Sequence, residues 1–169
     1  MNLDLGQISI AKDPRAGCPD QSRVSAGQRS SRSVGVIPFE FYLDGPPLSQ
    51  NTRNKRRLNA WKKRVRREAS ARWPAGEAPV TTEVSVKITY FYNSESPDVD
   101  NMIKPIQDAL KGIVYEDDSQ VGDTSSRKSR IDGVFKISGV SPELAVRLAR
   151  GRDFVRVRVL SAATHEDLQ

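Results

Sequence analysis

Residues 83–120 read EVSVKITYFYNSESPDVDNMIKPIQDALKGIVYEDDSQ, and this stretch changes from strand spacing to helix spacing around a set of acidic side chains. Apolar and polar residues alternate from Glu83 to Tyr90, which predicts a β-strand. Apolar residues then recur at helical spacing over Ile103–Leu110, and Gly112 is placed to cap that helix at its C-terminal end. The stretch therefore predicts a strand, an acidic segment, a helix and an acidic turn, in that order.

Pro105 lies inside the predicted helix and constrains where the helix begins. With Asp100 as the N-cap, Pro105 would delete the hydrogen bond to the carbonyl of Asn101. We therefore expect either an irregular first turn or a regular helix that starts nearer Lys104.

Three aspartates of this stretch, Asp98, Asp100 and Asp118, are the candidate catalytic and metal-binding residues. Residues two apart in an extended segment point the same way, so Asp98 and Asp100 can face one point. Asp118, beside Asp117, follows the helix on a turn that can return to the same edge of the sheet. Converging carboxylate oxygens suit Mg²⁺, or Mn²⁺ as a substitute, and such an ion activates water for attack on a phosphodiester. Lys104, one turn past Asp100, is placed to neutralise charge in the transition state.

The same segments also have a purely structural interpretation. An Asp-x-Asp-Asn run before an apolar stretch is a good helix cap, and Asp-Asp-Ser is an ordinary turn. Asp108, four residues after Lys104, can pair with it across one helical turn. Each segment alone favours this structural interpretation. The two together, with Lys104 between them in a basic chain, favour a function.

Composition narrows the chemistry that the chain can perform. The 169 residues carry a formal net charge of +6, which favours an anionic partner such as nucleic acid. One cysteine, Cys18, and one histidine, His165, exclude a Cys/His zinc cluster and a disulfide framework, and they argue against a catalytic triad. The chemistry must then come from carboxylates, lysines and arginines. With no apolar run long enough to cross a bilayer and no signal sequence, we expect a cytoplasmic protein with no membrane partner.

The residues before this stretch predict a strand and a helix. The alternation over Ile37–Leu43 predicts a strand that Gly45–Pro47 ends. Asn59 can cap a helix whose apolar stripe, at a spacing of four, runs over Trp61–Trp73. We expect both tryptophans of that stripe in the core rather than stacked on nucleic acid bases.

Basic side chains gather in the predicted loop and helix that follow the first strand. A charge run is usually a solvated helix face, but Glu68 is the only acid between Arg53 and Arg72. Cations without internal partners bind the phosphate backbone through counterion release and do not read sequence. The segment around Arg127 is a weaker second candidate. The candidate DNA-binding residues are Arg53, Lys55, Arg56 and Arg57 in the predicted loop and Lys62, Lys63, Arg66 and Arg67 on the predicted helix.

The C-terminal third completes the predicted fold. After Gln120 comes a polar, basic segment, and then a strand that includes Val134, Phe135 and Ile137. Ser141–Glu143 opens a short helix that Gly151 closes, and alternation over Val155–Val159 predicts a last strand. The order β-α-β-α-β-α-β predicts an α+β fold, with helices packed against a single small mixed β-sheet. We expect this domain to span 35–161, between a flexible extension at 1–34 and a tail at 162–169.

The acidic stretch resembles the signature of a known family. Asp-x-Asp-Asn-x-x-Lys-x-x-x-Asp-Ala-Leu at 98–110 and Asp-Asp-x-Gln at 117–120 are similar, in both halves and in their separation, to the RusA family of Holliday junction resolvases. The resemblance covers about residues 36–160 and includes the Pro-Pro-x-x-x-Asn of 46–51. It implies an α+β fold and a homodimer, of bacterial or phage type and associated with the nucleoid, that cuts four-way DNA junctions with Mg²⁺.

The resemblance also implies a role for each matching residue. Asp98, Asp100 and Asp118 become metal-binding catalytic acids, and Lys104 becomes the lysine that faces the phosphate. The family's best-known member has arginines just before the first aspartate, where this sequence has Glu95, Ser96 and Pro97. This departure affects how the protein would bind DNA and leaves the metal-binding residues unchanged. The implied supporting residues are Asn101, Asp117 and Gln120, and Asn51 joins the candidate DNA-binding residues.

Two other functions are compatible with the same residues. A nuclease of the same chemistry acting on flaps or replication forks needs the same carboxylates. A non-catalytic junction-binding or architectural protein needs only the basic surface. Cleavage of a four-way junction in Mg²⁺ and in EDTA separates the three.

Overall fold

The computed structural model describes residues 36–93, 98, 100–132 and 140–162. The predicted extension at 1–34 and the predicted strand over 134–137 therefore lie outside the described residues, as do Cys18, His165 and the segment at 95–97.

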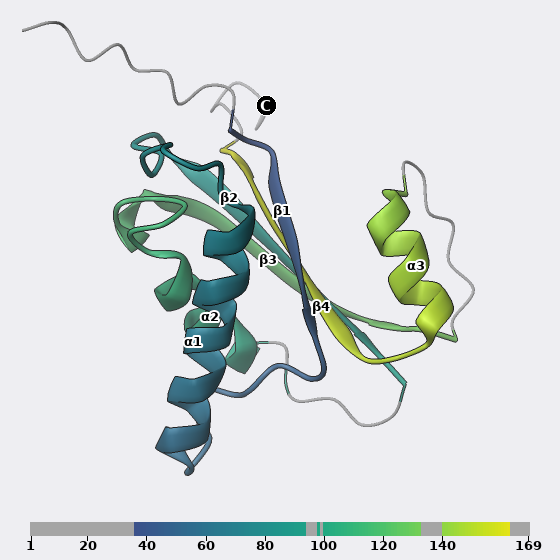
Figure 1. Ribbon diagram of the computed structural model, residues 1–169. Helices are drawn as coiled ribbons and strands as arrows, with labels where there is room; N and C mark the ends of the chain where they lie inside the picture. Colours follow the sequence, from purple (N-terminus) through teal and green to yellow (C-terminus); the bar gives the residue numbers. More distant parts are fainter. Residues whose placement is uncertain (1–35, 94–97, 99, 133–139, 163–169) are drawn as a thin grey trace, which may run out of the picture. The chain divides into compact units, whose positions relative to one another are not determined.

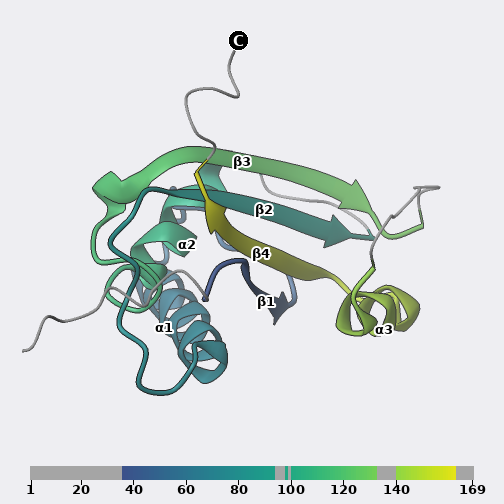
Figure 2. The ribbon, with the colours of Figure 1, turned by 90° about the horizontal axis from the view of Figure 1, so that it is seen from above.

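A four-stranded mixed sheet organises the described chain, and Figure 2 shows the strands in the order β1-β4-β2-β3. β1 (Phe39–Asp44) pairs antiparallel with β4 (Phe154–Ser161), and β4 pairs antiparallel with β2 (Val84–Tyr92). β3 (Val121–Arg130) pairs parallel with β2 and forms one edge. With α1 (Lys55–Arg72), α2 (Ile103–Leu110) and α3 (Pro142–Arg150), the predicted β-α-β-α-β-α-β order is confirmed (Figure 1).

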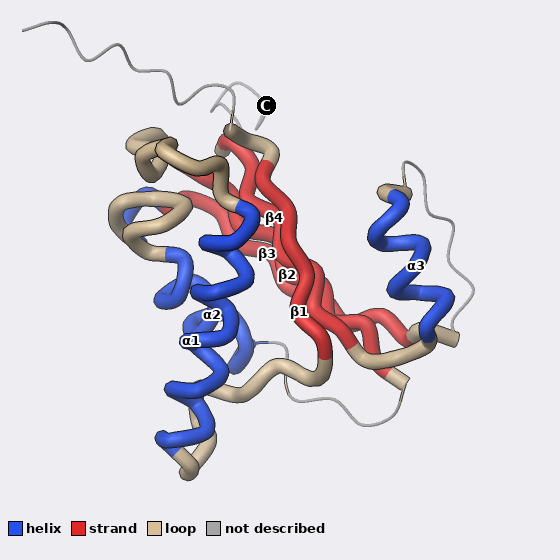
Figure 3. Tube along the Cα trace, in the orientation of Figure 1, coloured by secondary structure: helices blue, strands red, loops and turns tan. Residues whose placement is uncertain are grey.

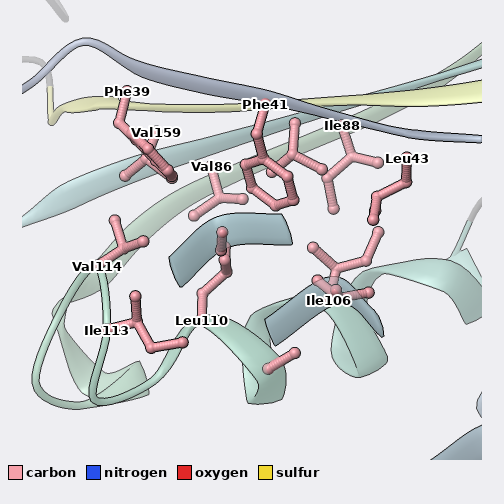
Figure 4. Close-up of a cluster of buried hydrophobic side chains, with 14 of the residues drawn as sticks. Phe39, Phe41, Leu43, Val86, Ile88, Ile106, Leu110, Ile113, Val114 and Val159 are labelled. Carbon is pink, nitrogen blue, oxygen red and sulfur yellow. The ribbon is translucent and has the colours of Figure 1, made fainter. Parts of the chain in front are cut away.

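The main core lies between one face of the sheet and the helices α1 and α2. Alternate residues of the strands point toward these helices, among them Phe41, Ile88 and Val157, and each is at most 1% exposed. Ile106 and Leu110 of α2 meet them from the helix side (Figure 4). Burial of this apolar surface is the main favourable contribution to folding, and it fixes α2 against the sheet. The buried residues of α1 are Leu58, Trp61, Val65 and Ala69.

α3 packs against the opposite face of the sheet (Figure 3). Leu144 of α3 is 1% exposed and belongs to a small cluster with Tyr42, Phe91 and Phe154. Phe91 and Phe154 stack with their ring centroids 4.5 Å apart. As predicted, Ser141 caps this helix and Gly151 ends it in the left-handed conformation, with φ of 60°. α3 covers the end of the sheet where these aromatic residues lie.

Two elements differ from the sequence expectation. α1 begins at Lys55, because Asn54 rather than Asn59 is its N-cap and accepts a hydrogen bond from the Arg57 amide at 2.9 Å. Lys55, Arg56 and Arg57 therefore form the first turn of a helix, and the prediction of a loop there is wrong. β3 occupies the segment that the sequence indicated only as polar and basic, because pairing with β2 and not apolar alternation makes it a strand.

Within the described residues, no helix combines the length and the hydropathy that crossing a bilayer requires.

Candidate active site

The first half of the acidic signature lies where the chain leaves β2 and enters α2. A 3₁₀ turn over Asp100–Met102 precedes the regular helix, which begins at Ile103. Pro105 is then the third residue of α2, where a backbone N–H has no partner inside the helix in any case. The expectation of an irregular first turn is confirmed. Asp98 and Asp100 are both exposed.

The second half is held by a turn that the chain makes after α2. Gly112 takes the left-handed conformation, with φ of 74°, and lets the chain reverse after α2. A second 3₁₀ turn over Asp118–Gln120 has a capping box: the Asp117 carboxylate accepts from the Ser119 amide at 3.0 Å, and Gln120 Oε1 accepts from the Asp117 amide at 2.8 Å. Gln120 Nε2 also donates to the carbonyl of Val80 at 2.9 Å, which ties the turn to the segment before β2. Asp117 and Gln120 therefore fix the turn that carries Asp118.

Lys104 joins the two halves of the signature. Its Nζ lies 2.8 Å from Oδ2 of Asp118. Lys104 is the second residue of α2 and follows Asp100, which lies in the preceding 3₁₀ turn, by four positions. The Lys104–Asp118 ion pair thus brings residues from two distant stretches of chain into one site.

Lys111 is a site residue that the sequence reasoning missed. Its Nζ lies 3.3 Å from Oδ1 of Asp118 and also pairs closely with Asp117. The available signal was its spacing, because Lys104, Asp108 and Lys111 follow one another at i, i+4 and i+7 on one helix face. Asp117 and Asp118 reach these two lysines because the chain reverses at Gly112, and the spacing along the helix does not reveal that reversal.

These contacts set the charge states of the site. Hydrogen bonds from Lys104 and Lys111 lower the pKa of Asp118, and Lys111 with the Ser119 amide lowers that of Asp117. Hydrogen bonds to Asp118 and Asp108 raise the pKa of Lys104. Asp118 is therefore ionised and Lys104 protonated throughout the neutral range.

Asp108 ties the site to α1. It pairs with Lys104 at 3.0 Å, as the sequence predicted, and also with Lys62 of α1 at 2.7 Å. Burial alone would raise the pKa of Asp108, but hydrogen bonds from Lys62 and Lys104 outweigh it and the pKa is lowered. Lys62, a candidate DNA-binding residue, is thus engaged in holding α1 to α2.

A third segment reaches the site from the loop between β1 and α1. Asn51 donates from its side-chain amide to Oδ1 of Asn101 at 2.8 Å, and the Gln50 amide donates to the Asn101 carbonyl at 2.8 Å. These two bonds place the Pro-Pro-x-x-x-Asn segment beside the start of α2. Asn51 therefore lies beside Asn101, the residue that follows Asp100 in the chain.

The donor chemistry of the aspartates fits a hard divalent cation, because Asp98 and Asp100 present exposed carboxylates and Asp118 is ionised. Across the described residues, however, no group of three or more His, Cys, Asp or Glu side chains lies close enough together to hold an ion. The structure brings Asp118 to two lysines and does not gather the three aspartates. Their shared metal-binding role stays a prediction.

The first turn of α1 carries cations in an electrostatically unfavourable place. Lys55, Arg56 and Arg57 lie at the positive end of the helix dipole, with no acidic residue in the turn. They are exposed, and within the described chain their side chains make no ion pair, as is also true of Arg53 and Lys63. Further along, Arg66 Nη1 donates to the Lys111 carbonyl at 3.0 Å and Arg67 pairs with Glu68 at 3.1 Å. The open cations of the candidate DNA-binding set therefore lie mainly at the N-terminal end of α1.

Trp61 lies in the core, as expected, whereas Trp73 is only partly buried and packs against the core from its edge. Trp61 is 7% exposed, and Trp73 packs edge-on against Phe39 with 5.1 Å between the ring centroids.

The comparisons with known proteins point to one family. The sequence model of the family described as Endodeoxyribonuclease RusA matches residues 48–149, which include both halves of the acidic signature, Asn51 and the whole of α1. A search of curated proteins gives no match.

Proposed function

The chain belongs to the RusA family of Holliday junction endodeoxyribonucleases, and we propose that it cuts four-way DNA junctions with Asp98, Asp100 and Asp118 as its metal-binding carboxylates. The observation that carries the residue assignment is the Lys104–Asp118 contact of 2.8 Å, because it connects the two halves of the signature through a single cation.

Nucleases of this family depend on a metal ion, and the ion we propose here is Mg²⁺, with Mn²⁺ as a substitute. Asp98, Asp100 and Asp118 would hold it, since hard divalent cations prefer carboxylate oxygens. Such an ion polarises a phosphoryl oxygen and lowers the pKa of a bound water. Asp117 and Gln120 keep the turn of Asp118 in place, and Asn51 with Asn101 does the same for the start of α2.

Lys104 acts on the phosphate that is being cut. Because its pKa is raised, Lys104 stays protonated at neutral pH and can donate a charge-assisted hydrogen bond to a phosphoryl oxygen. Asp108 holds the Lys104 ammonium at 3.0 Å and orients the side chain. Lys111 keeps Asp118 ionised and oriented from the other end of α2.

The DNA is held through its backbone by the cations at the start of α1. Arg53, Lys55, Arg56 and Arg57 are exposed and unpaired within the described chain, so phosphates can replace their counterions. Lys63, Arg66 and Arg67 extend the surface along the helix. We propose a homodimer, because a four-way junction has approximate two-fold symmetry and two equivalent sites would cut opposing strands.

Cleavage of a labelled four-way junction tests the proposal. We expect symmetric nicks in Mg²⁺ and none in EDTA. Asp100→Asn should abolish cutting and leave binding nearly intact, whereas Asp132→Asn, an exposed acid outside the signature, should cut as the unaltered protein does. Cuts on flaps but not on junctions would reassign the substrate. A shifted band with no cutting in Mg²⁺ would contradict the proposed enzyme.

A further inference from the structure

The sheet has a polar groove on the face opposite to α1 and α2. Because strand residues alternate between faces, Ile88 points into the main core while Lys87 and Thr89 point to the other side. No described helix covers this part of the face, since α3 packs at the end where the aromatic cluster lies. The residues that line this groove, about 290 Å³ in volume, and lie on that face are Lys87, Thr89, Ser125, Arg127, Arg156 and Arg158.

The pairing register places the groove's cations side by side. Lys87 of β2 lies directly opposite Arg158 of β4 and next to Ser125 of β3. In the neighbouring row, Thr89 has Arg156 on one side and Arg127 on the other. Like charges directly opposite each other on adjacent strands are destabilising, so the Lys87–Arg158 pair opposes folding.

The acids on this face do not balance these cations. Glu40 is opposite Arg158 in β1, and its Oε2 accepts from Arg156 at 2.6 Å and lies 3.2 Å from the Arg158 Nε. One carboxylate therefore serves two guanidinium groups. Asp123 lies beyond the groove and accepts from Ser85 at 2.8 Å. Within the described residues, Lys87 and Arg127 make no ion pair.

We infer that this groove is a second DNA-backbone surface, which binds a stretch of the junction other than the one being cut. The phosphodiester chain supplies the anionic oxygens that Lys87 and Arg127 lack, and the Thr89 and Ser125 hydroxyls are ordinary phosphate donors. The groove lies on the opposite face of the sheet from α2, so its phosphates are distinct from those that meet Lys104. This inference rests on the DNA substrate of the proposed function.

A second copy of the chain does not fit the groove as well as DNA does. In a two-fold interface the same patch meets itself, which would place Lys87, Arg127 and Arg158 against their own positive charges. Desolvating those charges without partners is costly. The groove also presents no exposed large apolar side chain to a protein partner, because Val140 and Val146, the large apolar side chains exposed in the described chain, lie outside it.

The test is the salt dependence of junction binding, measured in EDTA with a labelled four-way junction. Lys87→Gln with Arg127→Gln should weaken binding and make the log–log slope of affinity against salt shallower by about 2, at about 0.9 for each lost phosphate contact. The thermal midpoint should not fall, because the substitution relieves the repulsion between Lys87 and Arg158. The matched control is Arg150→Gln with Arg152→Gln, which removes two exposed cations elsewhere and should leave the slope nearly unchanged.

The outcomes separate this inference from the proposed function. If the unaltered protein neither binds nor cuts the junction, the proposed function fails. If it does both, and the Lys87/Arg127 variant matches it in affinity and slope, only the groove assignment is overturned. The groove assignment is also overturned if the control pair makes the salt slope equally shallow. It is overturned as well if the Lys87/Arg127 variant no longer self-associates in sedimentation, because the groove would then be a subunit contact.

Discussion

Lys104 contacts one acid of its own helix and one acid that follows the helix. Asp108 lies one turn further along α2 and Asp118 lies beyond the chain reversal, and Lys104 contacts both carboxylates at once. A lysine with two carboxylate partners is held in one position and kept protonated. Both properties suit a group that must meet a phosphoryl oxygen in a fixed place.

Removing this lysine should separate its catalytic role from a structural one. We expect Lys104→Ala to lower the single-turnover cleavage rate by about 10²–10³-fold, the usual effect of deleting one preorganised donor. The pKa of Asp118 should rise toward its ordinary value, because Lys104 is the largest cause of its depression. Cleavage kinetics and a carbon-13 titration of the Asp118 carboxyl measure the two effects. Lys104→Arg should lower the pKa of Asp118 again in part. A Lys104→Ala variant that cuts at the normal rate would contradict the catalytic role of Lys104.

At the scale of elements, the Lys62–Asp108 ion pair at 2.7 Å fastens α1 to α2. Each side chain is about one-third exposed, so solvent screening limits its contribution to stability. The pair nevertheless fixes the helix that presents DNA-binding cations against the helix that presents Lys104.

Asp108→Asn should lower the free energy of unfolding by about 1 kcal/mol at neutral pH, the upper end for such pairs. The pKa of Asp108 is held below its ordinary value of 3.8, so its stabilisation is complete above about pH 4 and is lost as the pH falls through the lowered pKa. The difference between variant and unaltered protein should therefore vanish in strong acid. Urea unfolding across this range measures it, with Glu77→Gln, an exposed acid that makes no ion pair within the described chain, as the control; a difference equally large at neutral pH and in strong acid would contradict the linkage.

The elements that the sequence predicts best are those with an apolar face. β2 and the strands at either end of the domain alternate regularly, and α2 has its own apolar stripe, so local pattern and burial agree. β3 reads VGDTSSRKSR and has no such alternation, because it is an edge strand whose exposed residues gain little from burial. Its existence depends on pairing with β2, which no local pattern records.

In the candidate site, too, some features could be predicted from the sequence and others could not. The signature residues Asp98, Asp100, Lys104 and Asp118 could be named from their chemistry and spacing. Apart from the Lys104–Asp108 pair, their contacts could not be predicted, because Lys62 meets Asp108 through the packing of α1 on α2 and Lys111 meets Asp118 through the chain reversal at Gly112. The start of α1 was predicted too late because the stripe was counted from Trp61, whereas Leu58 already lies in the core.

At the scale of the whole molecule, the basic side chains behind the net charge of +6 differ in whether an acid neutralises them. Several arginines and lysines are neutralised by neighbouring acids, whereas in the part of the chain that the structure describes the cations of the first turn of α1, and Lys87 and Arg127 of the polar groove, make no ion pair. Unbalanced cations of this kind raise the rate at which an anionic partner associates and bind it without sequence preference.

Arg56→Ala with Arg57→Ala should weaken junction binding uniformly across DNA sequences and make the salt slope shallower by about 2. Arg66→Ala with Arg67→Ala is the comparison within the same helix, and its effect should be smaller because these guanidinium groups already bind the Lys111 carbonyl and Glu68. Fluorescence anisotropy at several salt concentrations gives both slopes. Equal effects of the two pairs would show that the α1 cations act only through net charge.

The most direct test of the central claim is the anomalous diffraction of crystals of the protein grown with Mn²⁺. We expect a manganese peak with oxygens of Asp98, Asp100 and Asp118 at about 2.1 Å, the distance typical of hard divalent ions of this size. Lys104 should remain beside the site. A peak bound by one half of the signature alone, in a protein that still cuts junctions, would contradict the claim that the two acidic segments form one metal centre.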